Sequence, residues 1–76
     1  MSEADKMFEE LEYKKETRVA TDTKVDIIYT SKDMIIQFKS CWESIDFEIK
    51  GDAVIYSITA KEVQAINQKC KELGWL

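Results

Sequence analysis

The central part of the chain decides the fold, and residues 25–49 read VDIIYTSKDMIIQFKSCWESIDFEI. Apolar residues recur at every second position in three segments, 25–30, 34–39 and 44–49. This period of two is typical of strands that bury one face. Connections as short as Ser31-Lys32-Asp33 make neighbouring strands antiparallel. The pattern therefore predicts a meander of antiparallel strands with one apolar face.

Segments on either side of this centre extend the predicted sheet. Residues 13–23 combine charges with threonines and predict a short edge strand followed by a turn. The turn Lys50-Gly51-Asp52 contains a glycine that can adopt the positive φ of tight hairpins, and it predicts a last strand over Ala53–Ile58. We therefore expect four or five strands.

A helix is expected at each end of the chain. Ser2 can cap the first helix, which should end near Glu12 and whose apolar face consists of Ala4, Met7, Phe8 and Leu11. Thr59-Ala60-Lys61-Glu62 fits the capping box, in which each end residue bonds the backbone of the other. The helix that follows should stop at Gly74 and bury Val63, Ile66, Cys70 and Leu73.

These elements predict a single α+β domain over residues 1–76. An antiparallel β-meander of four or five strands has one apolar face to cover, and the N-terminal and C-terminal helices are available to pack on it. A chain of 76 residues has no room for a second core.

The negative charge of the chain is concentrated at its start. Residues 1–12 hold five acids against one lysine, which is −4, so the remaining ten acids and ten bases cancel. Residues 40–58 also lean acidic, with four acids and one base. Such segregation can steer a partner. The carboxylates of Glu9, Glu10 and Glu12 are therefore candidate protein-binding groups, and the polar face of the sheet is the other candidate surface.

The chain offers little for metal or cofactor chemistry. It has two cysteines, Cys41 and Cys70, and no histidine, whereas a structural zinc site requires four such ligands. No apolar run of signal-peptide length lies near Met1, so we expect two separate reduced thiols in place of a disulfide. We expect no bound metal and no cofactor.

Catalysis and nucleic-acid binding are also poorly supported. Histidine, the commonest general base, is absent, and no glycine-rich loop could hold a phosphate. Asp46 and Glu48 would share one strand face, where solvated strand residues are the simpler interpretation. A weak basic patch made by Lys14, Lys15, Arg18 and Lys24 follows an acidic helix that would oppose phosphates. We therefore expect no enzyme and no direct nucleic-acid contact.

Three large aromatic residues allow two interpretations. Trp42, Tyr56 and Trp75 belong to residue types enriched at the energetic centres of protein interfaces. In a domain with so small an interior, such residues more often lie in the core or at its rim. The core interpretation is favoured, and the interface interpretation stays open.

Both ends of the chain carry a resemblance to known sequences. The residues concerned are Met7–Leu11 with Tyr13, then Ile58-Thr59, Gln64–Asn67 and Glu72–Trp75, about a third of the chain. In these residues the chain resembles small uncharacterised phage and prophage proteins of low-GC Gram-positive bacteria (Firmicutes). Glu12 departs from them, since they often have glycine there. The resemblance implies a mobile-element origin and a cytoplasmic location in a bacterial host, and it implies no activity.

These observations lead to two functional hypotheses. The first is a non-enzymatic accessory protein of a phage or prophage that binds another protein, whose identity the sequence does not give, and so modulates a host protein. A subtype is an inhibitor whose carboxylates imitate a phosphate backbone, for which a net charge of −4 is small. The alternative is a homo-oligomeric structural component of a phage or mobile element that associates through an exposed edge strand or through the open sheet face. No apolar stretch approaches the roughly 20 residues of a membrane span, so no membrane contact is expected.

Overall fold

Two helices and one four-stranded sheet make up the computed structural model, which describes residues 2–52 and 56–76. The strands follow one another across the sheet in chain order, and every neighbouring pair is antiparallel. The elements are α1 (Glu3–Glu10), β1 (Lys14–Val19), β2 (Val25–Thr30), β3 (Met34–Lys39), β4 (Ser44–Ile49) and α2 (Ala60–Glu72). This confirms the predicted α+β meander, including the edge strand before residue 25.

A fifth strand does not appear in the described residues. Of the segment predicted as this strand, Ala53–Ile55 lie outside the described residues, and residues 56–58 belong to no strand. The turn before it forms as expected, with Gly51 at a φ of 79°. The described part of the sheet therefore ends with β4.

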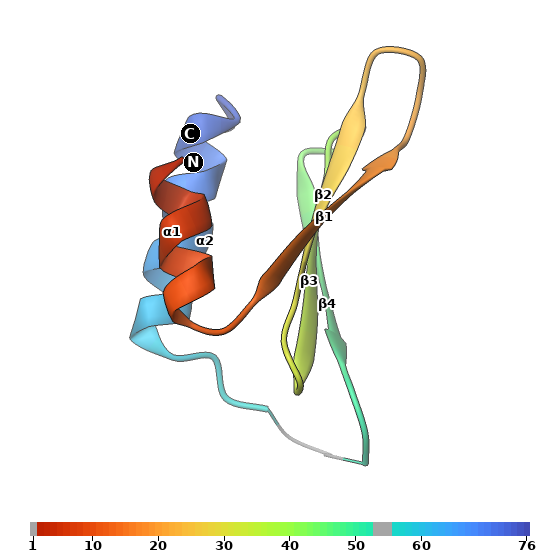
Figure 1. Ribbon diagram of the computed structural model, residues 1–76. Helices are drawn as coiled ribbons and strands as arrows, with labels where there is room; N and C mark the ends of the chain where they lie inside the picture. The colour runs from red at the N-terminus through yellow and green to blue at the C-terminus, as the bar shows by residue number, and fades with distance from the viewer. Residues whose placement is uncertain (1, 53–55) are drawn as a thin grey trace.

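Both helices lie on the same side of the sheet, antiparallel to each other (Figure 1). The start of α1 meets the end of α2, where the Ala4 N–H donates to the Glu72 carboxylate over 2.9 Å. That carboxylate also lies at the positive end of the α1 dipole, which favours it. The two helices are therefore stabilised by contacts with each other as well as by contacts with the sheet.

The register of the sheet aligns its buried face. Tyr29 of β2 lies opposite Ile36 of β3, which lies opposite Phe47 of β4. Lys15 of β1 completes this row on the side that faces the helices. The opposite face carries mainly polar and charged residues, although Ile28 is buried there between Glu16 and Gln37.

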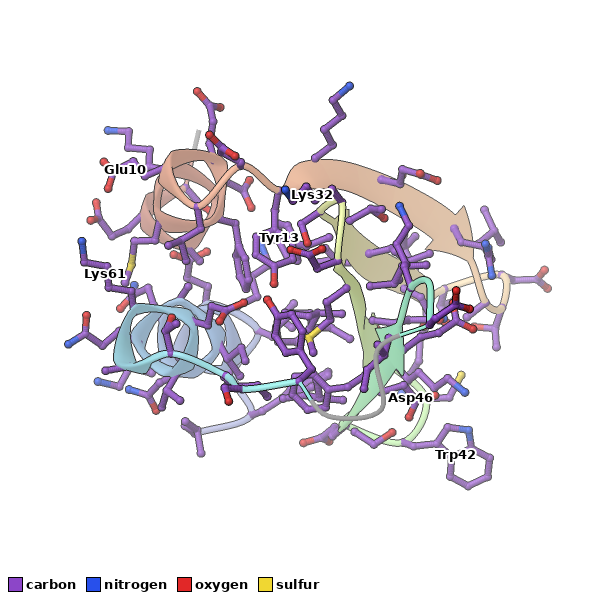
Figure 2. The ribbon with its side chains drawn as sticks, turned by 90° about the horizontal axis from the view of Figure 1, so that it is seen from below. Glu10, Tyr13, Lys32, Trp42, Asp46 and Lys61 are labelled. Carbon is purple, nitrogen blue, oxygen red and sulfur yellow. The ribbon has the colours of Figure 1, made fainter. Side chains whose placement is uncertain are left out.

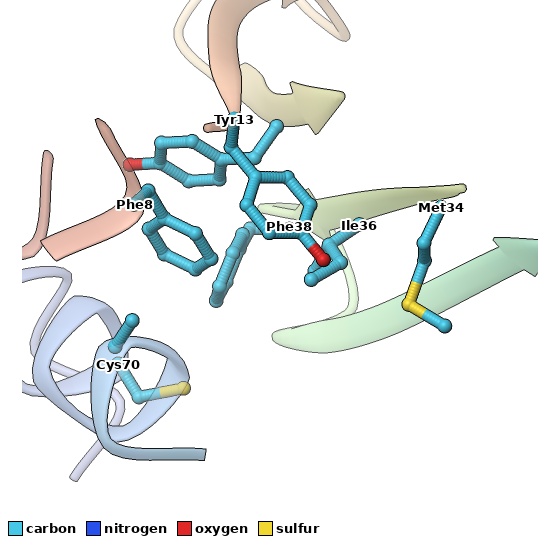
Figure 3. Packing of buried hydrophobic residues seen from close by; sticks show 8 residues of the cluster. Phe8, Tyr13, Met34, Ile36, Phe38 and Cys70 are labelled. Carbon is cyan, nitrogen blue, oxygen red and sulfur yellow. The ribbon is translucent and has the colours of Figure 1, made fainter. Parts of the chain in front are cut away.

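The core is an aromatic cluster between α1 and the central strands (Figure 3). Phe8 stacks on Tyr29 with 3.9 Å between ring centroids, and its edge meets Tyr13 and Phe38 at 5.5 and 6.2 Å. Phe8, Tyr29, Phe38 and Ile36 are the largest fully buried side chains. Each contributes about 2–3 kcal/mol through its burial.

The first helix ends two residues earlier than expected, in a Schellman motif. The Tyr13 N–H donates to the Phe8 carbonyl and the Glu12 N–H to the Glu9 carbonyl, and the Phe8–Tyr13 ring contact completes the motif. This turn places Glu12 at a φ of 67°, the left-handed region that favours glycine. The same motif ends α2, where Gly74 takes this position at 77°.

The buried face of α2 differs from the one that the apolar pattern predicts. Its buried residues are Glu62, Ala65, Lys69 and Cys70, whereas Val63 is 55% exposed. Ile66 and Leu73 are half-buried against the core, as expected. The prediction was wrong at Val63 because α2 packs beside α1 as well as on the sheet, which turns two charged side chains inward.

Candidate functional site

The six residues named from the sequence as binding candidates do not form one site. Glu9 and Glu10 are exposed on the last turn of α1, and Glu12 is exposed just after it. Trp42 is 78% exposed in the β3–β4 turn, on the opposite side of the molecule from Glu10 (Figure 2). Trp75 is half-buried, with its ring 6.1 Å from that of Phe38, so it belongs to the core.

The acidic residues at the C-terminal end of α1 lie where the helix dipole disfavours negative charge. Carboxylates are favoured near a helix N-terminus and disfavoured near its C-terminus. Glu3 and Asp5 follow this rule, but Glu9 and Glu10 lie in the last turn. Among the described residues, neither of these two forms a salt bridge, and nor does Glu12. The α1 dipole therefore does not explain these three carboxylates.

A hollow of about 280 Å³ lies where α1, α2 and the β2–β3 turn meet. Its lining includes Glu12, Tyr13, Lys32, Tyr56 and Glu62. The hollow therefore brings together two of the predicted binding candidates, Glu12 and Tyr56. At its base the Tyr13 hydroxyl donates to Glu62 Oε2 over 2.5 Å, and the Tyr56 hydroxyl donates to the same oxygen over 3.3 Å. Glu62 Oε1 accepts the capping N–H of Thr59.

These contacts favour one protonation state for each of Glu62 and Tyr13. Burial alone would raise the pKa of Glu62, but hydrogen bonds from Thr59, Tyr13 and Tyr56 outweigh it and lower the pKa. Burial and the hydrogen bond to Glu62 raise the pKa of Tyr13. The carboxylate is therefore ionised and the phenol protonated at neutral pH, and the pair fastens α2 to the start of β1.

A second cluster around Asp5 fastens α1 to the sheet. Asp5 Oδ1 accepts from the Tyr29 hydroxyl over 2.6 Å and lies 3.4 Å from the buried Lys69 ammonium. Asp5 Oδ2 accepts from Lys15 over 2.8 Å. Burial would raise the pKa of Asp5, but the bonds from Lys15 and Tyr29 and the charge of Lys69 hold it well below its usual range. Both carboxylate clusters therefore act as internal ties between elements.

A further surface of interest is the outer edge of the sheet at β4, residues Ser44–Ile49, which we call the β4 edge. Among the described residues, no strand pairs with its far side. On the face shared with the helices, Phe47 is 45% and Ile49 39% exposed, while their partners Ile36 and Met34 in β3 are buried. Single exposed apolar residues are common, but neighbouring ones such as Phe47 and Ile49 form the contiguous apolar surface that marks binding sites.

The backbone of β4 also presents hydrogen-bonding groups with which no strand of the described residues pairs. The Lys50 N–H donates to the Asp33 carbonyl, so Asp33 and Lys50 form a hydrogen-bonded pair of the β3–β4 ladder. Bonded and non-bonded pairs alternate in an antiparallel ladder. The N–H and C=O groups of Ile45, Phe47 and Ile49 therefore point away from β3, as in a strand ready to accept a neighbour.

The opposite edge of the sheet, at β1, is protected against pairing with another strand, unlike the β4 edge. Four of the six residues of β1, KKETRV, are charged. Charged side chains, lysine above all, protect edge strands from pairing with other chains. In addition, Lys15 is held against α1 by its salt bridge to Asp5. Among the described residues, β4 exposes two neighbouring large apolar side chains at its open edge, whereas β1 exposes one, Val19, at its end.

The other face of β4 is acidic. Asp46 and Glu48 project there, and Glu43 and Asp52 flank the strand in the adjoining turns. Lys39 bonds Asp46 over 2.8 Å, but more than a third of each side chain is exposed. Lys50 donates to the Ser31 carbonyl and forms no salt bridge with Glu48. Residues 43–52 therefore carry four acids against one base, or −3.

The sequence did not identify Phe47 and Ile49 as surface residues, because apolar residues that alternate with polar ones are typical of the buried face of a strand. The acidic bias of residues 40–58 and the expectation of an exposed strand edge pointed toward the sheet, but neither singled out these two residues. Periodicity gives the face of a strand, whereas its position at the edge depends on the sheet order. The missed residues are therefore those whose exposure follows from topology.

Other features of the described residues add no site. Both cysteines are free, Cys41 exposed and Cys70 buried, and burial raises the pKa of the Cys70 thiol. Within residues 2–52 and 56–76, no three potential metal ligands converge, and neither helix is long and apolar enough to cross a membrane. Comparisons with protein-family models, curated proteins and solved structures found no match.

Proposed function

We propose that the protein is a non-enzymatic accessory protein of a phage or prophage that acts by binding another protein through the β4 edge. The mobile-element origin rests on the sequence resemblance. The binding role rests on one observation, an edge strand that exposes large apolar side chains beside backbone groups with which no described strand pairs. Addition of a partner strand to such an edge is a common mode of peptide recognition.

The geometry shifts the proposal away from the acidic helix. Glu9, Glu10 and Glu12 offer charge alone, and contacts between exposed charges contribute little affinity. The β4 edge offers apolar area, backbone hydrogen bonds and charge together. Steering of a basic partner by α1 remains compatible with this arrangement.

A homo-oligomeric structural component is the second candidate, and the same observation supports it. Two copies could pair through their β4 edges, because an open strand edge accepts any strand. Light scattering across a wide concentration range tests this candidate, which predicts a mass that rises with concentration.

Capture from host lysate tests the binding proposal when wild type is compared with Phe47→Pro. Proline lacks an N–H and fits an edge strand where that group faces outward, so the change should block strand addition and leave the β3 ladder intact. Val63→Ala, on the exposed side of α2, serves as the matched control. A protein retained by wild type and by the control but lost with Phe47→Pro is the expected result. Retention of the same proteins by all three would refute the β4 edge as the surface.

A further inference from the structure

The inference concerns the occupant of the β4 edge and rests on the proposed function. We infer that the β4 edge receives an extended segment of another protein in which basic and apolar residues alternate. The strand has two chemically different faces, and an added strand continues both of them. Each face of β4 therefore determines which residue type is favoured at every second position of the partner segment.

The acidic face specifies the basic residues. A residue added opposite Asp46 or Glu48 has its Cβ about 5 Å from that of its neighbour, close enough for a cross-strand ion pair. Glu48 has no cationic partner among the described residues, and the side chain of Asp46 is 54% exposed despite its bond to Lys39. Lysine or arginine at alternate positions satisfies both carboxylates.

The helix-side face specifies the apolar residues. Residues added opposite Ile45, Phe47 and Ile49 lie on the core side of the sheet, because the β3 partners of these three residues are buried in the core. Apolar side chains there would remove the exposed area of Phe47 and Ile49 from water. The outward N–H and C=O groups of the same three residues supply the backbone bonds. A polar segment would leave this area exposed and gain only the backbone pairing.

The charges also argue against a second copy as the occupant. When two β4 strands pair antiparallel about a twofold axis at Phe47, Asp46 of each copy lies opposite Glu48 of the other. A shift by two residues places Asp46 opposite Asp46 in one direction and Glu48 opposite Glu48 in the other, although the second register also brings Asp46 opposite Lys50. Like charges directly opposite each other destabilise a strand pair. A basic and apolar strand from a different protein avoids every one of these conflicts.

Synthetic peptides test the inference with the whole protein. The probes are three peptides of equal length in which valine alternates with lysine, threonine or glutamate, and fluorescence polarisation gives their affinities. The lysine peptide should bind roughly tenfold more tightly than the threonine peptide, since ion pairs form at two positions. Raising the salt concentration should reduce this advantage. The glutamate peptide should bind least.

Two variants locate the contact. Asp46→Asn with Glu48→Gln should abolish the preference for lysine while keeping the affinity for the threonine peptide. Glu9→Gln with Glu10→Gln removes the same charge from α1 and should leave the preference unchanged. If the α1 pair reduces the preference as much as the β4 pair does, the attraction is general and the inference fails.

The remaining outcomes separate the inference from the proposed function. Equal binding of all three peptides, lost in Phe47→Pro, would overturn the charge pattern and keep the β4 edge as a binding surface. Lysine-peptide binding that survives Phe47→Pro would overturn strand addition itself. A dimer in light scattering that Phe47→Pro dissolves would identify a second copy as the occupant.

Discussion

Asp5→Asn tests the cluster that ties α1 to the rest of the molecule. The carboxylate accepts from Tyr29 and Lys15 and faces Lys69, whose side chain is 6% exposed. Asparagine can still accept from Tyr29, but its amide group carries no charge and turns N–H donors toward a lysine. Lys69 would then keep only Glu72, at 3.7 Å.

The magnitude follows from burial. Breaking one side of a fully buried ion pair costs about 3–5 kcal/mol, and an exposed pair is worth about 0–1 kcal/mol. The Asp5 side chain is 14% and that of Lys15 40% exposed, and Lys69 keeps one anion. We therefore expect a loss of about 2–3 kcal/mol, against a total of about 3–5 kcal/mol for a domain of this size.

Urea unfolding measures this loss. At about 1 kcal/mol/M for a small domain, the midpoint should fall by about 2 M. Both proteins should carry Trp42→Phe, so that Trp75, which packs on Phe38, reports the transition. Lys15→Met is the control and should lose less than about 1 kcal/mol, because that lysine is partly exposed.

The pH dependence supplies a second readout with a definite sign. Folding lowers the pKa of Asp5, so its contribution is present above the unfolded value of about 3.9 and is lost as the pH falls toward the folded value. The difference between wild type and Asp5→Asn should be full at pH 7 and shrink below about pH 4. Equal midpoints at pH 7, or a difference that persists unchanged at pH 3, would refute the role assigned to Asp5.

The remaining predictions concern caps, turns and thiols. Glu12→Gly should raise the free energy of unfolding by about 0.5–1 kcal/mol in thermal melts, because it relieves the left-handed backbone at a φ of 67°; a lower melting temperature would contradict this. Thr59→Ala should lose about 1 kcal/mol with the capping box, whereas an unchanged melt would show that Glu62 holds the helix start alone. A thiol reagent should modify Cys41 in the native protein and Cys70 only on unfolding, and equal rates would place Cys70 at the surface.

Local patterns identified most of the secondary structure. The three strands of residues 25–49 were predicted at their observed bounds, because alternation of apolar residues is a property of each strand taken alone. The Thr59 cap and the Gly74 stop were also local signals. The end of α1 was less accurate because Glu12 takes a glycine-like conformation without being glycine.

The candidate site was predicted poorly, for a different reason. The favoured core interpretation of the aromatic residues holds for Trp75, which packs against Phe38, and for Tyr56, which bonds Glu62, but not for the exposed Trp42. Val63 was expected inside and is exposed, while Lys69 was not expected inside and is buried. Such charged residues become buried only because partners distant in sequence, such as Asp5, are brought to them.

The sequence by itself determined the strands, most of the helix limits and the antiparallel meander, since these depend on spacing, caps and short turns within a few residues. Only the tertiary structure decided which side chains meet water. The Asp5 and Glu62 ties join residues 10 to 64 positions apart, and the exposure of Phe47 arises because β4 is last in the described sheet. Burial is a relation between elements, and alternation along one strand cannot specify which neighbour, if any, lies beside it.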